Sequence, residues 1–289
     1  MKIIFFGTSE FAVPALKALN KSGFEITAVV TTPDQPAGRK KAITPPPIKI
    51  AADFLKLKIL QPTKLRDNSL FEEFKSLAPD LCIVAAYGKI IPEEYLSVPK
   101  QGFLNIHPSL LPKYRGPTPI QTAILNGDTE TGITILRVDK DVDHGPIFIK
   151  KHFSIELGET YQQLHDRLAD EGAGLLLEVI SNIENIIPEE QNHDQATFTK
   201  MLERADGKID WSRPHQEIYN QIRALNPEPG TWTTWNDRIL NIKDASFTKA
   251  TEGHNEQLKL LIVQLEGKKE TSLADFLSGH PDFDISQLK

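Results

Sequence analysis

The chain has 289 residues, of which 39% are hydrophobic and 25% are charged, as in an ordinary globular protein. This length predicts two domains or one large domain, and the composition excludes a fibrous, collagen-like or wholly disordered chain. The net charge of −6 argues against nucleic-acid binding over the whole surface, and the single cysteine, Cys82, excludes an internal disulfide framework. No run approaches the ~18 apolar residues that span a bilayer, and Met1 to Phe6 lacks the features of a signal peptide. We therefore expect a cytoplasmic protein.

The first part of the chain alternates apolar strands with helices. An apolar run at Ile3–Phe6, a turn at Gly7 and a helical pattern over Phe11–Leu19 are typical of the start of a parallel α/β sheet. The same alternation predicts strands at Ile26–Val30, Leu81–Ala86, Phe103–His107, Ile133–Val138 and Pro146–Phe153, and helices at Ile48–Leu57, Pro119–Leu125 and Tyr161–Ile180. We expect one α/β domain with a mostly parallel sheet over residues 1–189.

A smaller, β-rich domain is expected after a change in composition. The polar residues 190–205 are interpreted as a linker, and residues 206–289 as the second domain. Its predicted elements are a helix with an apolar stripe at Ile218, Tyr219, Ile222 and Leu225, strands at Ile239–Ile242 and Leu258–Leu265, and a last helix at Ser272–Leu277. Asp244 to Gln257 is expected to be a short polar connection.

A long stretch without periodicity, Thr32 to Pro47, interrupts the first domain. It holds five prolines, and Gly38-Arg39-Lys40-Lys41 lies at its centre. Such loops are uncommon in compact domains and are usually functional or mobile. By itself, a basic loop of this kind is more often a solvated surface than a binding site.

Three polar residues are expected where predicted strands end. Asn105 and His107 are two residues apart on one strand, so their side chains point to the same face, and Asp143 follows the strand that ends at Val138. Sites in open α/β sheets form beyond the carboxyl ends of strands. An amide and an imidazole there suit a reaction that develops an oxyanion, such as acyl or formyl transfer. Residue types alone do not decide this, because a histidine before a proline is more often structural.

Longer motifs around these residues resemble those of the formyltransferases that use 10-formyltetrahydrofolate. Asn105 to Pro117 (NIHPSLLPKYRGP) resembles the first signature of this family, and Asp139 to Pro146 (DKDVDHGP) its second. Within the family, the chain is most similar to the branch that formylates initiator methionyl-tRNA. That resemblance covers nearly the whole chain, with further matches at Ile4–Ala12, Pro33–Lys41, Ala85–Pro92, Lys208–Trp211, Ile222–Pro227 and Leu265–Lys269.

The resemblance implies a specific set of roles. It implies that Asn105, His107 and Asp143 are catalytic, that Arg39, Lys40 and Lys41 contact the tRNA, and that no metal takes part. Folate-binding positions carried over from the family are Ser109, Leu110, Leu111, Pro112, Tyr87, Gly88, Ile90 and Asp141. The co-substrate would be 10-formyltetrahydrofolate, the partner initiator methionyl-tRNA, and the protein a monomer. The first domain would be Rossmann-like and the second OB-like and shorter than usual.

Two other functions stay open at this point. A sugar-nucleotide N-formyltransferase would use the same Asn105, His107 and Asp143 on a 4-amino-4-deoxysugar. A non-catalytic module that binds tRNA or folate would keep the basic loop and dispense with these three residues, all of which are present.

Overall fold

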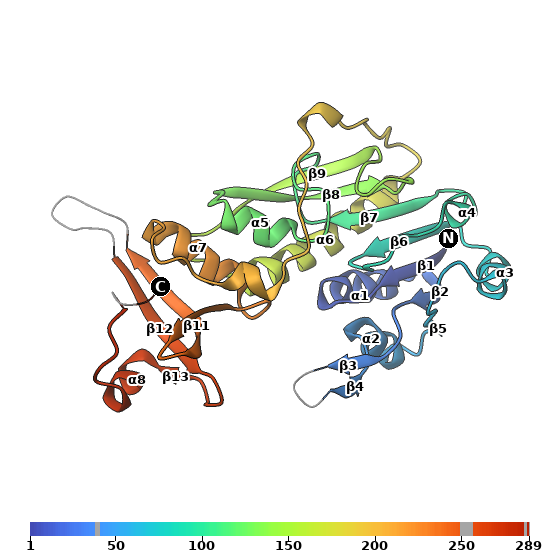
Figure 1. Ribbon diagram of the computed structural model, residues 1–289. Coiled ribbons are helices and arrows are strands. Elements are labelled where there is room, and N and C mark those ends of the chain that lie inside the picture. The colour runs from blue at the N-terminus through green and yellow to red at the C-terminus, as the bar shows by residue number, and fades with distance from the viewer. Residues whose placement is uncertain (38–40, 249–256, 286–287, 289) are drawn as a thin grey trace. The chain divides into compact units, whose positions relative to one another are not determined.

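The computed structural model describes residues 1–37, 41–248, 257–285 and 288 (Figure 1). The chain packs into two compact units. The first contains residues 1–117, 132–152 and 165–198, and the second contains residues 118–131, 153–164 and 199–289. No helix in the described part is long and apolar enough to cross a membrane. The domain boundaries at residues 189 and 206 stay a prediction.

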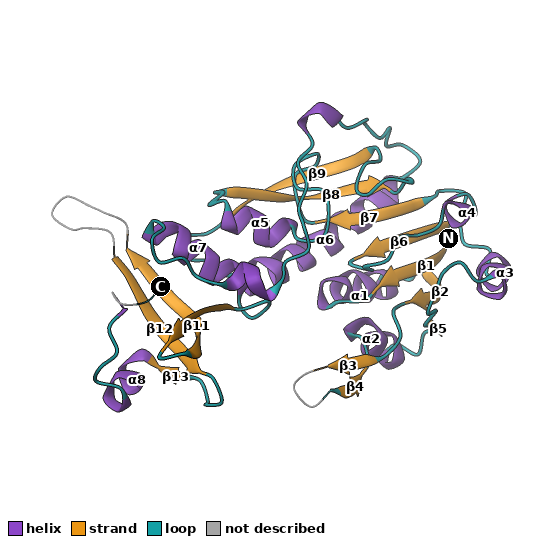
Figure 2. Ribbon diagram, in the orientation of Figure 1, coloured by secondary structure: helices purple, strands orange, loops and turns teal. Residues whose placement is uncertain are grey.

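A seven-stranded sheet forms the centre of the first unit (Figure 2). Its order is β5 (Ile59–Leu60), β2 (Glu25–Val30), β1 (Lys2–Gly7), β6 (Leu81–Ala85), β7 (Phe103–His107), β8 (Glu130–Arg137) and β9 (Ile147–Ser154). The pairs from β5 to β7 are parallel, and β8 runs antiparallel to β7. The predicted mostly parallel sheet is therefore confirmed.

Apolar residues on both faces of the central strands explain why β1 and β6 lie inside. Two faces need two layers of helices, as in other mostly parallel sheets. The helical elements of the first part of the chain are a 3-10 turn at Glu10–Ala12, α1 (Val13–Lys21), α2 (Pro47–Phe54), α3 (Asn68–Ser76), α4 (Glu93–Leu96), α5 (Pro119–Leu125) and α6 (Tyr161–Asn182).

The two faces of β7 have different neighbours. Phe103 packs in a cluster with Phe74 of α3 and Tyr95 of α4. Ile106, on the opposite face, lies under α6, where a Cβ atom added to Gly172 would be 2.9 Å from the Ile106 Cγ2 atom. Because side chains alternate along a strand, Asn105 and His107 share the face of Phe103 and not that of α6.

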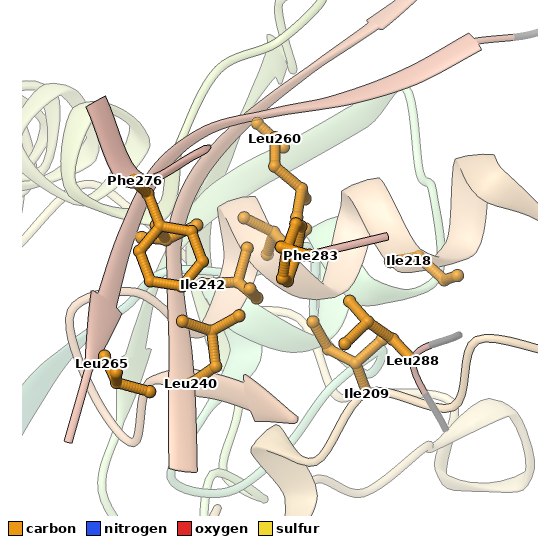
Figure 3. Packing of buried hydrophobic residues seen from close by; sticks show 12 residues of the cluster. Ile209, Ile218, Leu240, Ile242, Leu260, Leu265, Phe276, Phe283 and Leu288 are labelled. Atoms are coloured by element: carbon orange, nitrogen blue, oxygen red, sulfur yellow. The ribbon is translucent and has the colours of Figure 1, made fainter. Parts of the chain in front are cut away.

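The second unit is β-rich, as predicted, and its core is an antiparallel sheet. Its order is β10 (Thr231–Trp235), β11 (Arg238–Thr248), β12 (Gln257–Leu265) and β13 (Thr271–Ser272). Helices α7 (His215–Leu225) and α8 (Leu273–Gly279) accompany it, and two 3-10 turns at His193–Gln195 and Arg204–Gly207 precede α7. Figure 3 shows side chains from these elements converging on one apolar cluster, among them Ile218, Leu240, Ile242, Leu260, Leu265 and Phe276.

The structure differs from the sequence expectations in several segments. Helix α3 and strand β10 were not expected. The stretch from Thr32 to Pro47, expected to be irregular, contains a hairpin of β3 (Gln35–Ala37) and β4 (Ala42–Thr44). Residues 244–248, expected to be a polar connection, extend β11 and pair with β12. Residues 249–256 of that connection lie outside the described part.

Candidate active site

Asn105, His107 and Asp143 come together at the carboxyl end of β7. The Asn105 Nδ2 atom donates a hydrogen bond to Asp143 Oδ1 over 3.1 Å, and His107 Nδ1 lies 3.5 Å from Asp143 Oδ2. The side chains of His107 and Asp143 are only 5% and 10% exposed. At that burial an ion pair is much less screened by water than one at the surface. The three residues that the sequence singled out therefore form one polar group.

The Tyr114 carbonyl fixes the protonation of one imidazole nitrogen. It lies 2.9 Å from His107 Nε2, and a carbonyl only accepts hydrogen bonds, so Nε2 carries a proton. The other ring nitrogen, Nδ1, faces the Asp143 carboxylate. The separation of 3.5 Å is longer than an ordinary hydrogen bond. An incoming oxygen atom can thus compete with Asp143 for the Nδ1 proton.

Asp143 is held in an unusual backbone conformation. Its φ is +50°, in the left-handed region that non-glycine residues seldom adopt. The backbone N–H of Gly116 donates to Asp143 Oδ2 over 2.9 Å, which adds a second anchor to the one from Asn105. Tyr114, which binds His107, also has a positive φ, of 64°. Such conformations persist where the surroundings enforce them, and they cluster at functional sites.

Hydrogen bonds and buried side chains stabilise the loop that follows β7. The Ser109 hydroxyl donates to the Lys113 carbonyl over 2.6 Å, and the Thr134 hydroxyl donates to the Ser109 carbonyl over 2.7 Å. Leu111 is fully buried beside Leu136 and Ile147. Within the predicted folate segment, the side chains of Ser109 and Leu111 therefore stabilise the loop. Leu110 and Pro112 are partly exposed, and their contact with folate stays a prediction.

The other predicted folate residues lie in two different settings. Tyr87 is 2% exposed and packs edge-on against Phe6, and burial raises the pKa of its phenol. Its carbonyl accepts a hydrogen bond from the Thr8 hydroxyl over 2.9 Å. Gly88, Ile90 and Asp141 are exposed. The tyrosine is thus a core residue, and these three belong to the surface.

The basic loop is only partly within the described chain. Arg39 and Lys40 lie outside the described residues, and Lys41 directly precedes β4 with a φ of 48°. At the base of the loop, Lys49 Nζ forms an ion pair of 2.8 Å with Asp34. A hydrogen bond from Gln61 and then the bond to Lys49 lower the pKa of Asp34. Within the described residues, the one acid of the loop is therefore paired with Lys49.

Comparison with known proteins decides the family. The Formyl transferase model matches residues 1–180, and the model of the Formyl transferase C-terminal domain matches residues 201–256. This chain belongs to the formyl transferase family. The chain is 40% identical to the methionyl-tRNA formyltransferase of Caldanaerobacter subterraneus subsp. tengcongensis, over 97% of each protein. It is 42% identical to that of Chloroflexus aurantiacus, over 98% of each.

Solved structures of this family share the fold at lower identity. An N-formyltransferase from Helicobacter canadensis, solved with folinic acid and dTDP-3-aminofucose, superposes with a TM-score of 0.69 at 23% identity. That match covers 94% of this chain and 98% of the other. The methionyl-tRNA formyltransferase from Clostridium thermocellum superposes with a TM-score of 0.63 at 19% identity, over 92% and 98% of the two chains.

Asn105, His107 and Asp143 are called the triad below. Three groups that form hydrogen bonds to His107 or Asp143 were not predicted from the sequence. They are the Tyr114 carbonyl, the Gly116 N–H and the amide of Gln191, which donates to the Asp143 carbonyl over 2.9 Å. The first two lie inside the motif at residues 105–117, so their position in the motif was the available signal. Nothing in the sequence links Gln191 to Asp143, because they are 48 residues apart.

Proposed function

We propose that this formyl transferase moves the formyl group of 10-formyltetrahydrofolate to the methionine amino group of initiator methionyl-tRNA, for translation initiation. The observation that carries the proposal is the set of methionyl-tRNA formyltransferases that are about 40% identical over almost the full length of both proteins. That similarity includes the second unit.

The triad supplies the chemistry in this proposal. The α-amino group of methionine attacks the formyl carbon, and the formyl oxygen gains negative charge. The Asn105 amide carries two protons; one binds Asp143, and the second is assigned to the formyl oxygen. We assign the His107 Nδ1–H to the same oxygen. Each such donor is worth about 10²–10³ in rate.

Asp143 acts on His107 and on proton transfer. Its Oδ2 atom lies 3.5 Å from His107 Nδ1, so the carboxylate orients the imidazole edge that we assign to the oxyanion. The amine must lose a proton as the new C–N bond forms, and folate N10 must gain one before tetrahydrofolate leaves. We assign Asp143 to relay that proton through water, as a general acid and base.

We assign the residues that bind folate and tRNA from the positions and exposure of the loops. We assign the folate co-substrate to the exposed Gly88, Ile90 and Asp141 and to the loop at Ser109–Pro112. Tyr87, whose side chain is in the core, would contribute through its backbone. Arg39, Lys40 and Lys41 would pair with tRNA phosphates, which makes binding depend on salt.

The experiment is a parallel test of acceptors with purified protein and 10-formyltetrahydrofolate. The acceptors are methionyl initiator tRNA, a 4-amino-4-deoxysugar nucleotide and dTDP-3-aminofucose. We expect transfer to the tRNA. Transfer only to a sugar nucleotide would refute tRNA as the substrate but leave the catalytic roles of the triad unchanged. Ligand binding without any turnover would favour a non-catalytic binding module.

A further inference from the structure

A segment beyond β9 and α6 crosses the active-site loops. We call residues Glu189–Phe198 the strap. At its start, Glu189 exchanges two backbone hydrogen bonds with Ile147, of 2.8 and 2.9 Å. Near its end, the Thr197 carbonyl accepts from the Arg115 N–H over 2.8 Å, and the Thr197 hydroxyl accepts from the Tyr114 N–H over 2.8 Å. The strap therefore contacts the start of β9 and the loop that binds His107.

Gln191 of the strap is 5% exposed and uses both ends of its amide. Its Nε2 atom donates to the carbonyls of Asp143 and Gly145 over 2.9 and 2.8 Å. Its Oε1 atom accepts from Arg115 Nη2 over 2.6 Å and from Arg115 Nε over 3.2 Å. Carbonyls only accept and a guanidinium only donates, so these partners fix the orientation of the amide.

These bonds connect the loop that follows β7 with the loop that carries Asp143. Arg115 precedes Gly116, whose N–H binds the Asp143 carboxylate, while Gln191 binds the Asp143 carbonyl. Asp143 is thereby held at its side chain by one loop and at its backbone by the strap. Its positive φ needs such external support, because the conformation is unfavourable for an isolated residue.

We propose that Gln191 is a positioning residue for formyl transfer, which fixes the carboxylate of Asp143 relative to His107 through the Asp143 and Gly145 carbonyls. This inference rests on the proposed function, because it needs a measurable transfer reaction. It assigns a role in catalysis to a segment outside both matched family regions, residues 1–180 and 201–256.

The informative variant is Gln191→Glu. Its carboxylate still accepts from Arg115, but it has no N–H to donate and sets an oxygen against the two carbonyls. The chain offers a matched control in Gln221, which is 7% exposed and donates from Nε2 to the carbonyls of Asp206 and Lys208 over 2.8 and 3.1 Å. Gln221→Glu thus removes an equivalent pair of bonds on α7 of the second unit.

Single-turnover transfer to methionyl initiator tRNA is measured with enzyme in excess, together with thermal unfolding. We expect Gln191→Glu to lower the rate about 10–100-fold, as small misplacements of catalytic groups do, with KM for folate and tRNA within about twofold of wild type. Gln221→Glu should keep the wild-type rate. In an Asp143→Asn background the Gln191→Glu penalty should disappear, since the two residues act through one interaction.

The outcomes separate this inference from the proposed function. A wild-type protein without transfer to the tRNA refutes the proposed function before any variant is compared. With an active wild type, the inference is overturned if Gln191→Glu retains the wild-type rate, if both glutamine variants lose activity in proportion to unfolded protein, or if the penalty persists in Asp143→Asn. If Gln191→Glu does not fold, the isosteric, uncharged Gln191→Met takes its place with the same criteria.

Discussion

The substitution Gly145→Ala tests whether the transfer rate depends on the exact position of the loop after β8, which carries Asp143. A Cβ atom at this position would lie 2.1 Å from the carbonyl oxygen of Arg137, whereas such contacts are at least 3.0 Å in real proteins. The two segments must therefore separate by about 0.9 Å. Asp143 is two residues away and shares the hydrogen-bonded loop, so it moves as well. A displacement near 1 Å costs on the order of 100-fold in rate.

The assay is steady-state transfer to methionyl initiator tRNA, which should show a kcat about 100-fold below wild type. The control is Gly174→Ala in α6, where an added Cβ atom meets nothing within 4 Å. A glycine in the middle of a helix costs roughly 0.5–1 kcal/mol relative to alanine, so this variant should unfold at higher denaturant and keep its kcat. A Gly145→Ala protein with the wild-type kcat would refute the reasoning.

Three further predictions concern other parts of the chain. Asn105→Ala should lower kcat by about 10²–10³ with little change in KM, and a wild-type kcat would remove Asn105 from the oxyanion site. Arg39→Ala should raise KM for tRNA but not for folate, with a shallower dependence on salt; an unchanged slope would exclude this arginine from tRNA binding. Tyr95→Phe removes the donor to the Leu65 carbonyl, at 2.8 Å, and should lower the free energy of unfolding by about 1–3 kcal/mol in urea titrations. Burial, aided by the charges of Glu94 and Asp67, raises the pKa of Tyr95 to about 12, so wild-type stability should decline from about pH 10 to 12. The Phe variant keeps Tyr87, whose pKa is also raised, and should therefore decline less steeply; equal slopes would contradict the assignment.

The central sheet was predictable because its strands are buried on both faces. Ile3–Phe6 and Leu81–Ala85 are nearly continuous apolar runs, which is how strands of a parallel sheet appear in a sequence. Asn105 and His107 were predictable as a pair, because the alternation of side chains along a strand places both on one face. Their proximity to Asp143 did not follow from the rule that parallel strands end at one edge, because β8 runs antiparallel to β7 and Arg137 at its end pairs with Leu104. The loop after β8 returns along the sheet and brings Asp143 to the carboxyl end of β7.

The elements that were missed have weaker local signals. Helix α3 is short, although Asp67 caps it by accepting from the N–H groups of Ser69 and Leu70. The β3–β4 hairpin lies among prolines, which favour irregular structure. Strand β11 continues through polar residues to Thr248 because β12 supplies its partners. Pairing between distant segments overrides local propensity there.

The contacts of Gln191 could not be predicted from the sequence. A glutamine in a polar stretch has no pattern that predicts a buried position, and the polarity of residues 190–205 suggested a linker. Its burial results from three acceptor and donor groups that meet only in the folded chain: the Asp143 carbonyl, the Gly145 carbonyl and the Arg115 guanidinium. The Gln191 amide can be buried because it forms hydrogen bonds with all three of these groups.

The most direct test compares wild-type protein with Asp143→Asn in single-turnover transfer of the formyl group from 10-formyltetrahydrofolate to methionyl initiator tRNA. The variant keeps the shape of the side chain and removes its charge. We expect the wild type to formylate the tRNA and Asp143→Asn to do so about 10²–10⁴ times more slowly. A wild-type protein that does not formylate the tRNA, or a variant that matches the wild-type rate, would contradict the account.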